Sequence, residues 1–186
     1  MKYLLFIVLL ISSTLYSCLD DDNVRSSSQE GEEFNDFISK FEKDKGVSLT
    51  QSPDGVFYCF DTVGNLNYPV MVGDSLLVRY VLTDISSANR IDEKVNETLN
   101  FVYPGRDDNS FIKGFNYSIA LSKLHSYGHF MFTSDLGYGS TGSIYLAPYS
   151  SLYFQIEIVD IYRDGISLSA QEQTADSLKT IQAIRY

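Results

Sequence analysis

The chain has 186 residues, of which 20% are charged and 14% are aromatic, with no Trp. A charged fraction of this size is too low for a disordered polyelectrolyte, so we expect one folded domain with extensions. The formal charge of −10, with Lys and Arg scattered along the chain, argues against a nucleic-acid partner, because a phosphate backbone would be repelled.

The N-terminus has the features of a bacterial signal peptide. A single Lys precedes an apolar run over residues 3–11, which is too short to span a bilayer. The residues LYS that lead into Cys18 resemble the lipobox of lipoproteins, in which the cysteine becomes diacylated. An ordinary secretory signal with an incidental cysteine is the alternative. The lipobox predicts a signal peptide over residues 1–17 and a membrane anchor at Cys18.

Residues 18–28 are expected to form an acidic, Ser-rich tether. Asp20, Asp21 and Asp22 resemble the acidic signal that carries some lipoproteins to the outer face of the outer membrane. A solvated acidic spacer is the alternative, and the protein would then face the periplasm. We therefore expect an outer-membrane lipoprotein exposed at the cell surface, with the periplasm-facing orientation as the alternative.

Residues 29–46 have the period of an amphipathic helix. One apolar stripe has the i, i+3, i+4, i+7 spacing and is formed by Phe34, Phe37, Ile38 and Phe41. Ser27 and Glu30 are spaced as a capping box, and Gly46 is a typical helix stop. We expect the stripe to pack on the domain, with a free binding face as the alternative.

Strand signals dominate residues 53–162. Runs rich in β-branched and aromatic residues, bounded by Gly, Pro, Asp or Asn, cover residues 55–60, 75–84, 97–103, 129–134 and 151–162. The last run alternates most regularly, and one helical window over residues 115–128 interrupts the series. This order predicts an α+β fold in which a bent, mainly antiparallel sheet wraps around one short α-helix.

Cys59 and the two histidines do not indicate a disulfide or a metal site. Once Cys18 is lipidated, Cys59 has no partner for an intramolecular disulfide, and its apolar surroundings favour a small buried side chain. His125 and His129 would share one side of a helix, as metal ligands do, but Gly128 indicates that the helix stops before His129. We expect no metal site there.

The C-terminal extension, residues 163–186, has two interpretations. It forms either a short helix from Ser169, with Leu178 and Ile181 on one side, or a frayed tail.

Three motifs follow one another within residues 53–162: VGDSLLVRYVLTD, then SFIKGFNYSIALSKL, then LGYGSTGSIYLAPYSSLYFQIEIVDI. In order and approximate spacing they resemble the signatures of the FKBP-type peptidyl-prolyl cis-trans isomerases. The resemblance implies an FKBP-like domain over residues 53–162. It also implies a protein that binds proline-containing peptide or protein segments and uses neither a cofactor nor a metal.

The resemblance implies roles for individual side chains as well. In that family the Gly-rich turn forms one wall of a shallow apolar pocket that takes a prolyl ring. A backbone N–H, here that of Ile112, anchors a substrate carbonyl, the Tyr138 hydroxyl donates a second hydrogen bond, and Asp92 would orient Tyr80. The catalytic positions are matched by Tyr80, Asp92, Ile112 and Tyr138. The substrate-pocket positions are matched by Leu99, Phe101, Phe111, Phe115 and Phe154.

The chain also departs from the family pattern. Ile91 stands where an aromatic ring is expected, Phe115 replaces the more common Trp, and the last turn lacks the usual second Pro. Two classes of function therefore remain. The protein is either a membrane-anchored isomerase and folding factor for exported proteins, of weak activity, or a non-catalytic FKBP-fold lipoprotein with a binding or structural role at the surface.

Overall fold

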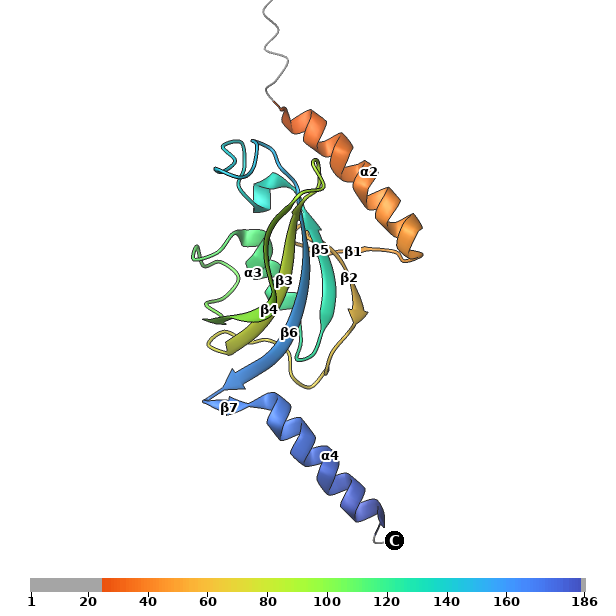
Figure 1. The fold of residues 1–186 in the computed structure, drawn as a ribbon, viewed down its shortest axis with the longest axis vertical. Helices are drawn as coiled ribbons and strands as arrows, with labels where there is room; N and C mark the ends of the chain where they lie inside the picture. The colour runs from red at the N-terminus through yellow and green to blue at the C-terminus, as the bar shows by residue number, and fades with distance from the viewer. Residues whose placement is uncertain (1–24, 185–186) are drawn as a thin grey trace, which may run out of the picture.

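The computed structural model describes residues 25–184, so the expected signal peptide and Cys18 lie outside the described residues. The described helices are α2 (Ser27–Lys45), α3 (Lys113–Leu121) and α4 (Leu168–Ile184), with a single 3-10 turn, η1 (Ser134–Leu136). The strands are β1 (Thr50–Gln51), β2 (Phe57–Thr62), β3 (Ser75–Asp84), β4 (Arg90–Val102), β5 (Tyr127–Phe132), β6 (Leu152–Arg163) and β7 (Ile166–Ser167). Figure 1 shows their arrangement.

The strands form one seven-stranded antiparallel sheet. Its order is β1-β2-β5-β6-β3-β4, and β7 pairs with β6 outside this path. β6 lies inside the sheet between β5 and β3. The period-two alternation of β6 places its apolar side chains on one face, where Leu152, Phe154, Ile156 and Ile158 are all buried.

Different helices cover the two faces of this sheet. On one face, Phe115 and Ile119 of α3 pack into the main core against inward side chains of the sheet such as Phe130 and Ile156. On the other face, the apolar stripe of α2 packs on Met131 and Tyr153. The architecture is therefore α+β, with an antiparallel sheet bent around α3 and an N-terminal helix outside it (Figure 1).

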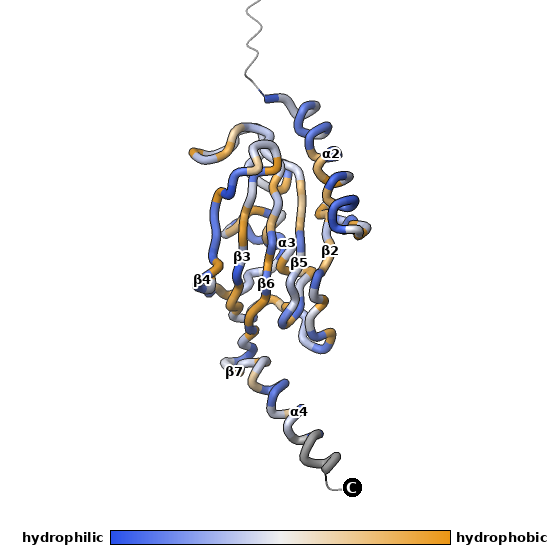
Figure 2. Tube along the Cα trace, turned by 45° about the vertical axis from the view of Figure 1, so that its right-hand side comes forward, coloured by the Kyte–Doolittle hydropathy of each residue, from blue (hydrophilic) through white to orange (hydrophobic). Residues whose placement is uncertain are grey.

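Helix α2 has the expected amphipathic stripe, and its hydrophobic positions recur along an otherwise hydrophilic helix (Figure 2). It starts two residues earlier than expected. Ser26, rather than Ser27, is the N-cap, and its side chain accepts from the N–H of Gln29. Glu30 does not form a capping box, because its carboxylate instead accepts hydrogen bonds from Ser134 and Ser151. Gly46 ends the helix in the left-handed region, at φ 67°.

The expected helix over residues 115–128 is too long and starts too late. Helix α3 covers Lys113–Leu121, and the chain then turns into β5. Serine side chains explain the early end, because the Ser122 hydroxyl donates to the Ser118 carbonyl at 2.9 Å. That bond replaces the backbone bond that would continue the helix. The expected strand over residues 97–103 is likewise one end of the longer β4, whose pairing with β3 shifts register at two irregularities.

The C-terminal segment forms helix α4, which projects away from the sheet (Figure 1). Its first turns contact the domain: Leu168 is buried, and the Asn65 amide donates to the Glu172 carboxylate at 2.6 Å. Among residues 25–184, no helix is both long enough and apolar enough to cross a membrane.

Candidate functional site

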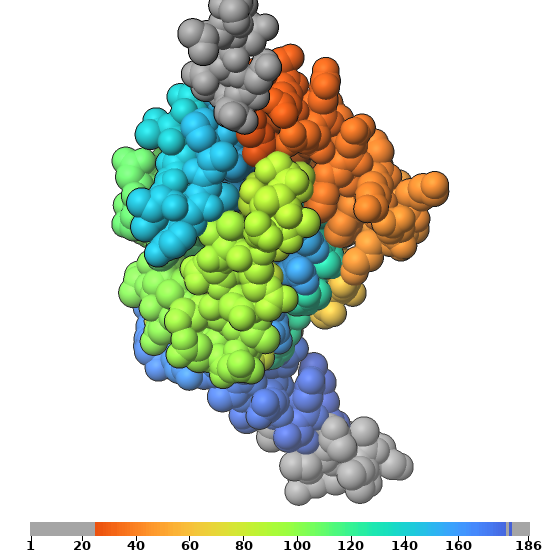
Figure 3. All heavy atoms as spheres, turned by 45° about the horizontal axis from the view of Figure 1, so that its top comes forward, coloured from red at the N-terminus to blue at the C-terminus, as the bar shows by residue number. Residues whose placement is uncertain are grey.

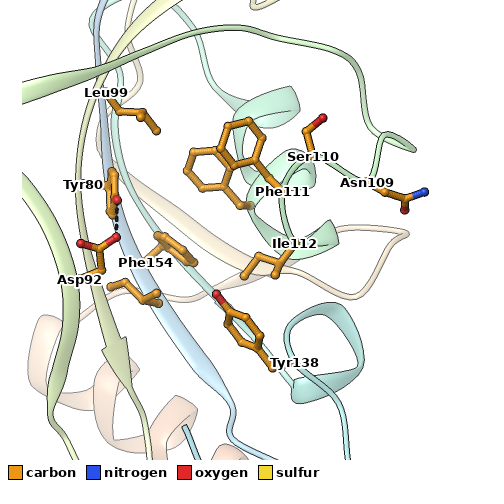
Figure 4. A pocket seen from close by; sticks show the side chains of 11 residues that line it. Tyr80, Asp92, Leu99, Asn109, Ser110, Phe111, Ile112, Tyr138 and Phe154 are labelled. Carbon is orange, nitrogen blue, oxygen red and sulfur yellow. Dashed lines mark hydrogen bonds between the residues drawn. The ribbon is translucent and has the colours of Figure 1, made fainter. Parts of the chain in front are cut away.

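A cavity of about 400 Å³ opens on the side of the sheet that α3 covers. Its size is in the range of small-molecule and peptide sites. It is lined by Tyr80, Leu82, Asp92, Leu99, Asn109, Ser110, Phe111, Ile112, Phe115, Tyr138 and Phe154 (Figure 4). The structure thus brings together every site residue expected in the domain except Phe101.

Phe115 and Phe154 form the apolar floor of the cavity. Each is 4% exposed, and their ring centroids lie 5.5 Å apart. Phe111 packs on Phe115 at 5.1 Å and continues the apolar wall. Phe101 is not in the lining. Its ring packs behind the wall, 4.9 Å from Phe111 and 5.8 Å from Phe115, so it supports rings that line the cavity.

Tyr80 and Asp92 are the polar pair at one side of the cavity. They lie on the neighbouring strands β3 and β4, and the Tyr80 hydroxyl donates to Asp92 Oδ2 at 2.6 Å. Burial, and then the hydrogen bond and charge of Asp92, raise the pKa of Tyr80 far above its usual value. The bond keeps the Tyr80 hydroxyl in one orientation, directed at Asp92.

The N-terminus of α3 faces the cavity from the opposite side. Ile112 is the N-cap, in extended backbone with φ −62° and ψ 146°, and it supplies no side-chain cap. The first N–H groups of a helix have no intrahelical partner, so this end can donate to a carbonyl oxygen. Asn116 holds the preceding loop in place, because its side-chain amide donates to the Asp108 carbonyl at 2.8 Å.

Tyr138 comes from the Gly-rich loop that follows η1. The residue is 38% exposed, and Figure 4 shows its hydroxyl directed into the cavity. The loop folds back on itself, with the Gly142 N–H donating to the Tyr138 carbonyl at 3.1 Å. Gly142 has φ +68°, and a Cβ there would lie 2.4 Å from the Leu146 carbonyl oxygen. Only glycine fits this position, so the loop needs it to hold Tyr138 beside the cavity.

Leu82, Asn109 and Ser110 also line the cavity, although sequence reasoning did not single them out. Leu82 follows Tyr80 by two positions on β3, so the strand period alone places both on one face. Asn109 and Ser110 precede Phe111 in a loop, where no periodicity indicates which side chains face a cavity.

The histidines do not form a pair. His129 is 2% exposed on β5, whereas His125 lies in the turn before that strand, with φ 61°. The His129 Nδ1 lies 2.6 Å from the Tyr153 hydroxyl, and its Nε2 lies 3.0 Å from the Asp61 carboxylate. Within residues 25–184, no cluster of three or more His, Cys, Asp or Glu side chains is placed to hold a metal.

Among solved structures, the chain is similar to FkpA from Escherichia coli, with a TM-score of 0.60 and 22% identity over 86% of this chain and 70% of that one. It is also similar to a peptidyl-prolyl cis-trans isomerase from Pseudomonas syringae pv. tomato, with a TM-score of 0.59 and 18% identity over 75% of this chain and 98% of that one. No protein-family model matches the chain, and a search of curated proteins found no match. At these identities the similarity shows the fold alone, which is α+β and FKBP-like.

Proposed function

We propose that the protein is an FKBP-like peptidyl-prolyl cis-trans isomerase of weak activity that acts as a folding factor for exported proteins. The observation that carries this proposal is the composition of the cavity. Its floor is built from aromatic rings, and its polar groups, Tyr80 with Asp92, Tyr138 and the open end of α3, surround that floor. A proline-containing segment offers both an apolar ring and free carbonyls to such a site.

The chemistry of prolyl isomerisation accounts for an apolar floor. Rotation about an amide must overcome about 18–20 kcal/mol because resonance keeps the bond planar. Resonance also places negative charge on the carbonyl oxygen of the planar amide. A dry site lined by Phe115 and Phe154 disfavours that charge, while the twisted amide, which carries less of it, is less affected. The barrier is therefore lowered without a nucleophile or a general base.

The polar groups around the floor would fix the substrate. The backbone N–H of Ile112 would anchor one substrate carbonyl, and the Tyr138 hydroxyl, which is directed into the cavity, would donate to a second. The Tyr80 hydroxyl already donates to Asp92 and is fixed by that bond, so Tyr80 contributes its ring to the cavity wall. In this proposal Ile112 and Tyr138 bond to the substrate, Asp92 positions Tyr80, and the ring of Tyr80 and the surrounding rings hold the prolyl side chain.

Location and clients also belong to the proposal. We infer that Cys18 carries the lipid and that Asp20, Asp21 and Asp22 direct the protein to the outer membrane, where it faces the cell surface. The support is the sequence pattern, since these residues lie outside the described range. The clients would be unfolded or partly folded exported chains, because only these expose X-Pro bonds that still isomerise.

A protease-coupled prolyl-peptide assay on a soluble chain that begins at Arg25 tests the activity. Acceleration of cis-to-trans conversion would support an isomerase, and peptide binding without acceleration would support a non-catalytic binding protein. Leu99→Trp should abolish either effect by filling the cavity from its wall. Val102→Trp, on the same strand at a position 61% exposed, is the matched control and should abolish neither. A parent protein that neither binds nor isomerises prolyl peptides would contradict the proposal.

A further inference from the structure

Glu30 of α2 connects the N-terminal helix to the loop that carries Tyr138. The residue is 4% exposed, and its carboxylate accepts three hydrogen bonds. Ser134 donates its N–H at 2.6 Å and its hydroxyl at 2.8 Å, and Ser151 donates its hydroxyl at 2.7 Å. Ser134 and Ser151 are the two ends of the loop over residues 134–151, so one carboxylate joins both ends.

A buried carboxylate is unfavourable unless its lone pairs are satisfied. In residues 25–184 no Lys, Arg or His forms an ion pair with Glu30, so the three hydrogen bonds compensate for its burial. Hydrogen bonds to an ionised acceptor are stronger and shorter than neutral ones. They also fix the donors in direction, and two of the three donors belong to Ser134.

Ser134 in turn restrains the backbone on both sides of Tyr138. Its backbone carbonyl accepts the N–H of Gly137 at 2.8 Å and the N–H of Gly139 at 2.9 Å. These two glycines flank Tyr138, so the residue whose hydroxyl enters the cavity is held on both sides by a residue that Glu30 holds. Because neither glycine has a side chain to pack, hydrogen bonds are the main restraint on this turn.

Arg25 adds a second contact between α2 and the same region. Its guanidinium donates to the Ser150 hydroxyl at 3.3 Å and to the Ser86 hydroxyl at 2.8 Å, and it pairs with Glu33 of the helix. Ser86 lies in the turn between β3 and β4, and Ser150 lies in the 134–151 loop. Figure 3 shows the start of α2 against both segments.

We propose that Glu30 is a positioning residue for the site, acting through Ser134 to place the Tyr138 hydroxyl, with Arg25 in a supporting role. This inference deepens the proposed function and rests on it for its effect on peptide binding. It makes α2 part of the machinery of the site, although α2 packs on the opposite face of the sheet and none of its residues lines the cavity.

Glu30→Gln tests the inference, with Glu32→Gln, at an exposed position of the same helix, as the matched control. The first measurement is amide hydrogen exchange, which needs no ligand. We expect the Gly137 and Gly139 amides to exchange about tenfold faster in Glu30→Gln, the equivalent of one hydrogen bond, and to be unchanged in Glu32→Gln. Equal exchange in the two variants would overturn the inference, whatever the peptide data show.

The second measurement is prolyl-peptide affinity in a double-mutant cycle. Glu30→Gln alone should weaken prolyl-peptide binding by less than tenfold, about as much as Tyr138→Phe does. The double variant should bind the peptide only slightly more weakly than either single variant. A purely structural role for Glu30 predicts additive losses, and additive losses would overturn the positioning role. If exchange rises as expected but the parent binds no prolyl peptide, the proposed function fails while the restraint of the loop by Glu30 stands.

Ser151→Ala keeps the test sharp if Glu30→Gln does not fold. This variant removes one of the three donors and leaves the carboxylate bonded to Ser134. We expect faster exchange in the 134–151 loop, by a smaller factor, and a modest fall in the urea midpoint, because a buried carboxylate loses one of its three donors. Exchange identical to the parent would count against Glu30 as the residue that restrains the loop.

Discussion

Gly114 lies in the first turn of α3, against the ring of Phe132 from β5. A Cβ at this position would lie 2.2 Å from Phe132 Cζ. Phe132 is fully buried and stacks on Phe154, the ring in the floor of the cavity, at 6.0 Å. The ring therefore has no free space to move into, and the close approach of α3 to the sheet depends on the missing side chain.

Gly114→Ala should lower the free energy of unfolding by about 1–3 kcal/mol, because the added methyl overpacks the core. Gly31→Ala is the control in α2, where a Cβ would meet nothing within 4 Å. That control should raise stability by about 0.5–1 kcal/mol, since Ala is the better helix former. Urea unfolding followed by circular dichroism measures both. A Gly114→Ala variant as stable as the parent, or more stable, would mean that the Phe132 ring can move aside.

Tyr138→Phe should keep the fold and weaken peptide binding by about 0.5–1.5 kcal/mol, the net contribution of one hydrogen bond. The reason is that the hydroxyl points into the cavity from a residue that is 38% exposed, so little packing changes. Tyr145→Phe is the control on the same loop, at 74% exposure and outside the lining. Isothermal titration with a prolyl peptide compares them, and equal affinities for the two variants would remove Tyr138 from the site.

At the scale of single residues, sequence motifs predicted most of the cavity lining, because most of the expected residues lie on strands or at the start of α3, where a local pattern fixes their direction. The motifs placed Phe101 in the lining as well, but its ring is one layer behind Phe111. Whether the Phe101 ring lines the cavity or lies behind another ring depends on how β4 and α3 pack together. Asn109 and Ser110 were missed for a related reason, since a loop gives no periodicity from which to read direction.

Among the elements, α2 was predictable in its apolar stripe and unpredictable in its polar contacts. The stripe follows from the helical period alone. The bonds from Glu30 to Ser134 and Ser151 join residues more than 100 positions apart, and nothing local indicates them. The end of α3 was misplaced because serine hydroxyls compete for its last carbonyls, which a hydrophobic pattern does not register.

His129 makes the packing of α2 on the sheet sensitive to pH. The ring is stacked on Tyr153 and contacts Phe41 of α2, with Asp61 and Lys45 at its Nε2 edge. Burial lowers the pKa of His129, although the hydrogen bond and charge of Asp61 oppose the shift. The hydrogen bond from His129, first of all, lowers the pKa of Asp61. In the folded protein His129 is therefore neutral at a pH where the unfolded chain binds a proton.

The unfolded state then binds more protons than the folded state below the ordinary histidine pKa of about 6.5, so stability should fall as the pH is lowered through that value. Loss from Asp61 should follow at lower pH, below about 4, as its unfolded carboxyl is protonated. Urea midpoints at pH 7.5 and 5.5 measure the first step. His129→Gln should show a smaller drop than the parent, and His125→Gln, at the exposed turn, should show the drop of the parent. A drop of the same size in His129→Gln would assign the effect to other groups.

For the whole molecule, the fold class was predictable because five strand signals and one helix follow in the order of a known family. The partner of each strand was not, because alternation shows which face a side chain takes and not which strand lies beside it. The place of β6 inside the sheet and the full length of β4 came only from the structure. Between the expected strands over residues 75–84 and 97–103, the chain also pairs with β3, over residues 90–94.

The proposed anchor gives a prediction for the intact protein in cells. Cys18→Ser should move the protein from the membrane fraction to the soluble fraction or block its maturation, because several buried acyl chains hold a protein on a bilayer. Cys59→Ser is the matched control, since Cys59 is half-buried in the domain and carries no proposed lipid. Ultracentrifugation after cell lysis separates the outcomes. Membrane association that survives Cys18→Ser would reject the anchor.

Changing Asp20, Asp21 and Asp22 together to Ala should leave the protein lipidated and remove it from the cell surface. Protease added to whole cells reports surface exposure, and release of the protein from membranes only by detergent reports the anchor. If the protease digests the triple variant as fast as the parent, the three aspartates are not an export signal and serve only as part of the tether.

The position of β6 has a consequence for how the chain is made. β6 pairs with residues that come much earlier in the chain, with Ser75 opposite Tyr162 and Phe132 opposite Leu152. The strands β5 and β3 are therefore not joined until β6 is present. Closing such long intervals makes folding slow, on the order of milliseconds to seconds for sheets of high contact order. During synthesis the chain therefore stays unfolded until residues 152–163 have emerged from the ribosome. For a protein that we propose is exported, this delay keeps the polypeptide unfolded, and so able to pass through a translocation channel, while its N-terminus engages the export machinery.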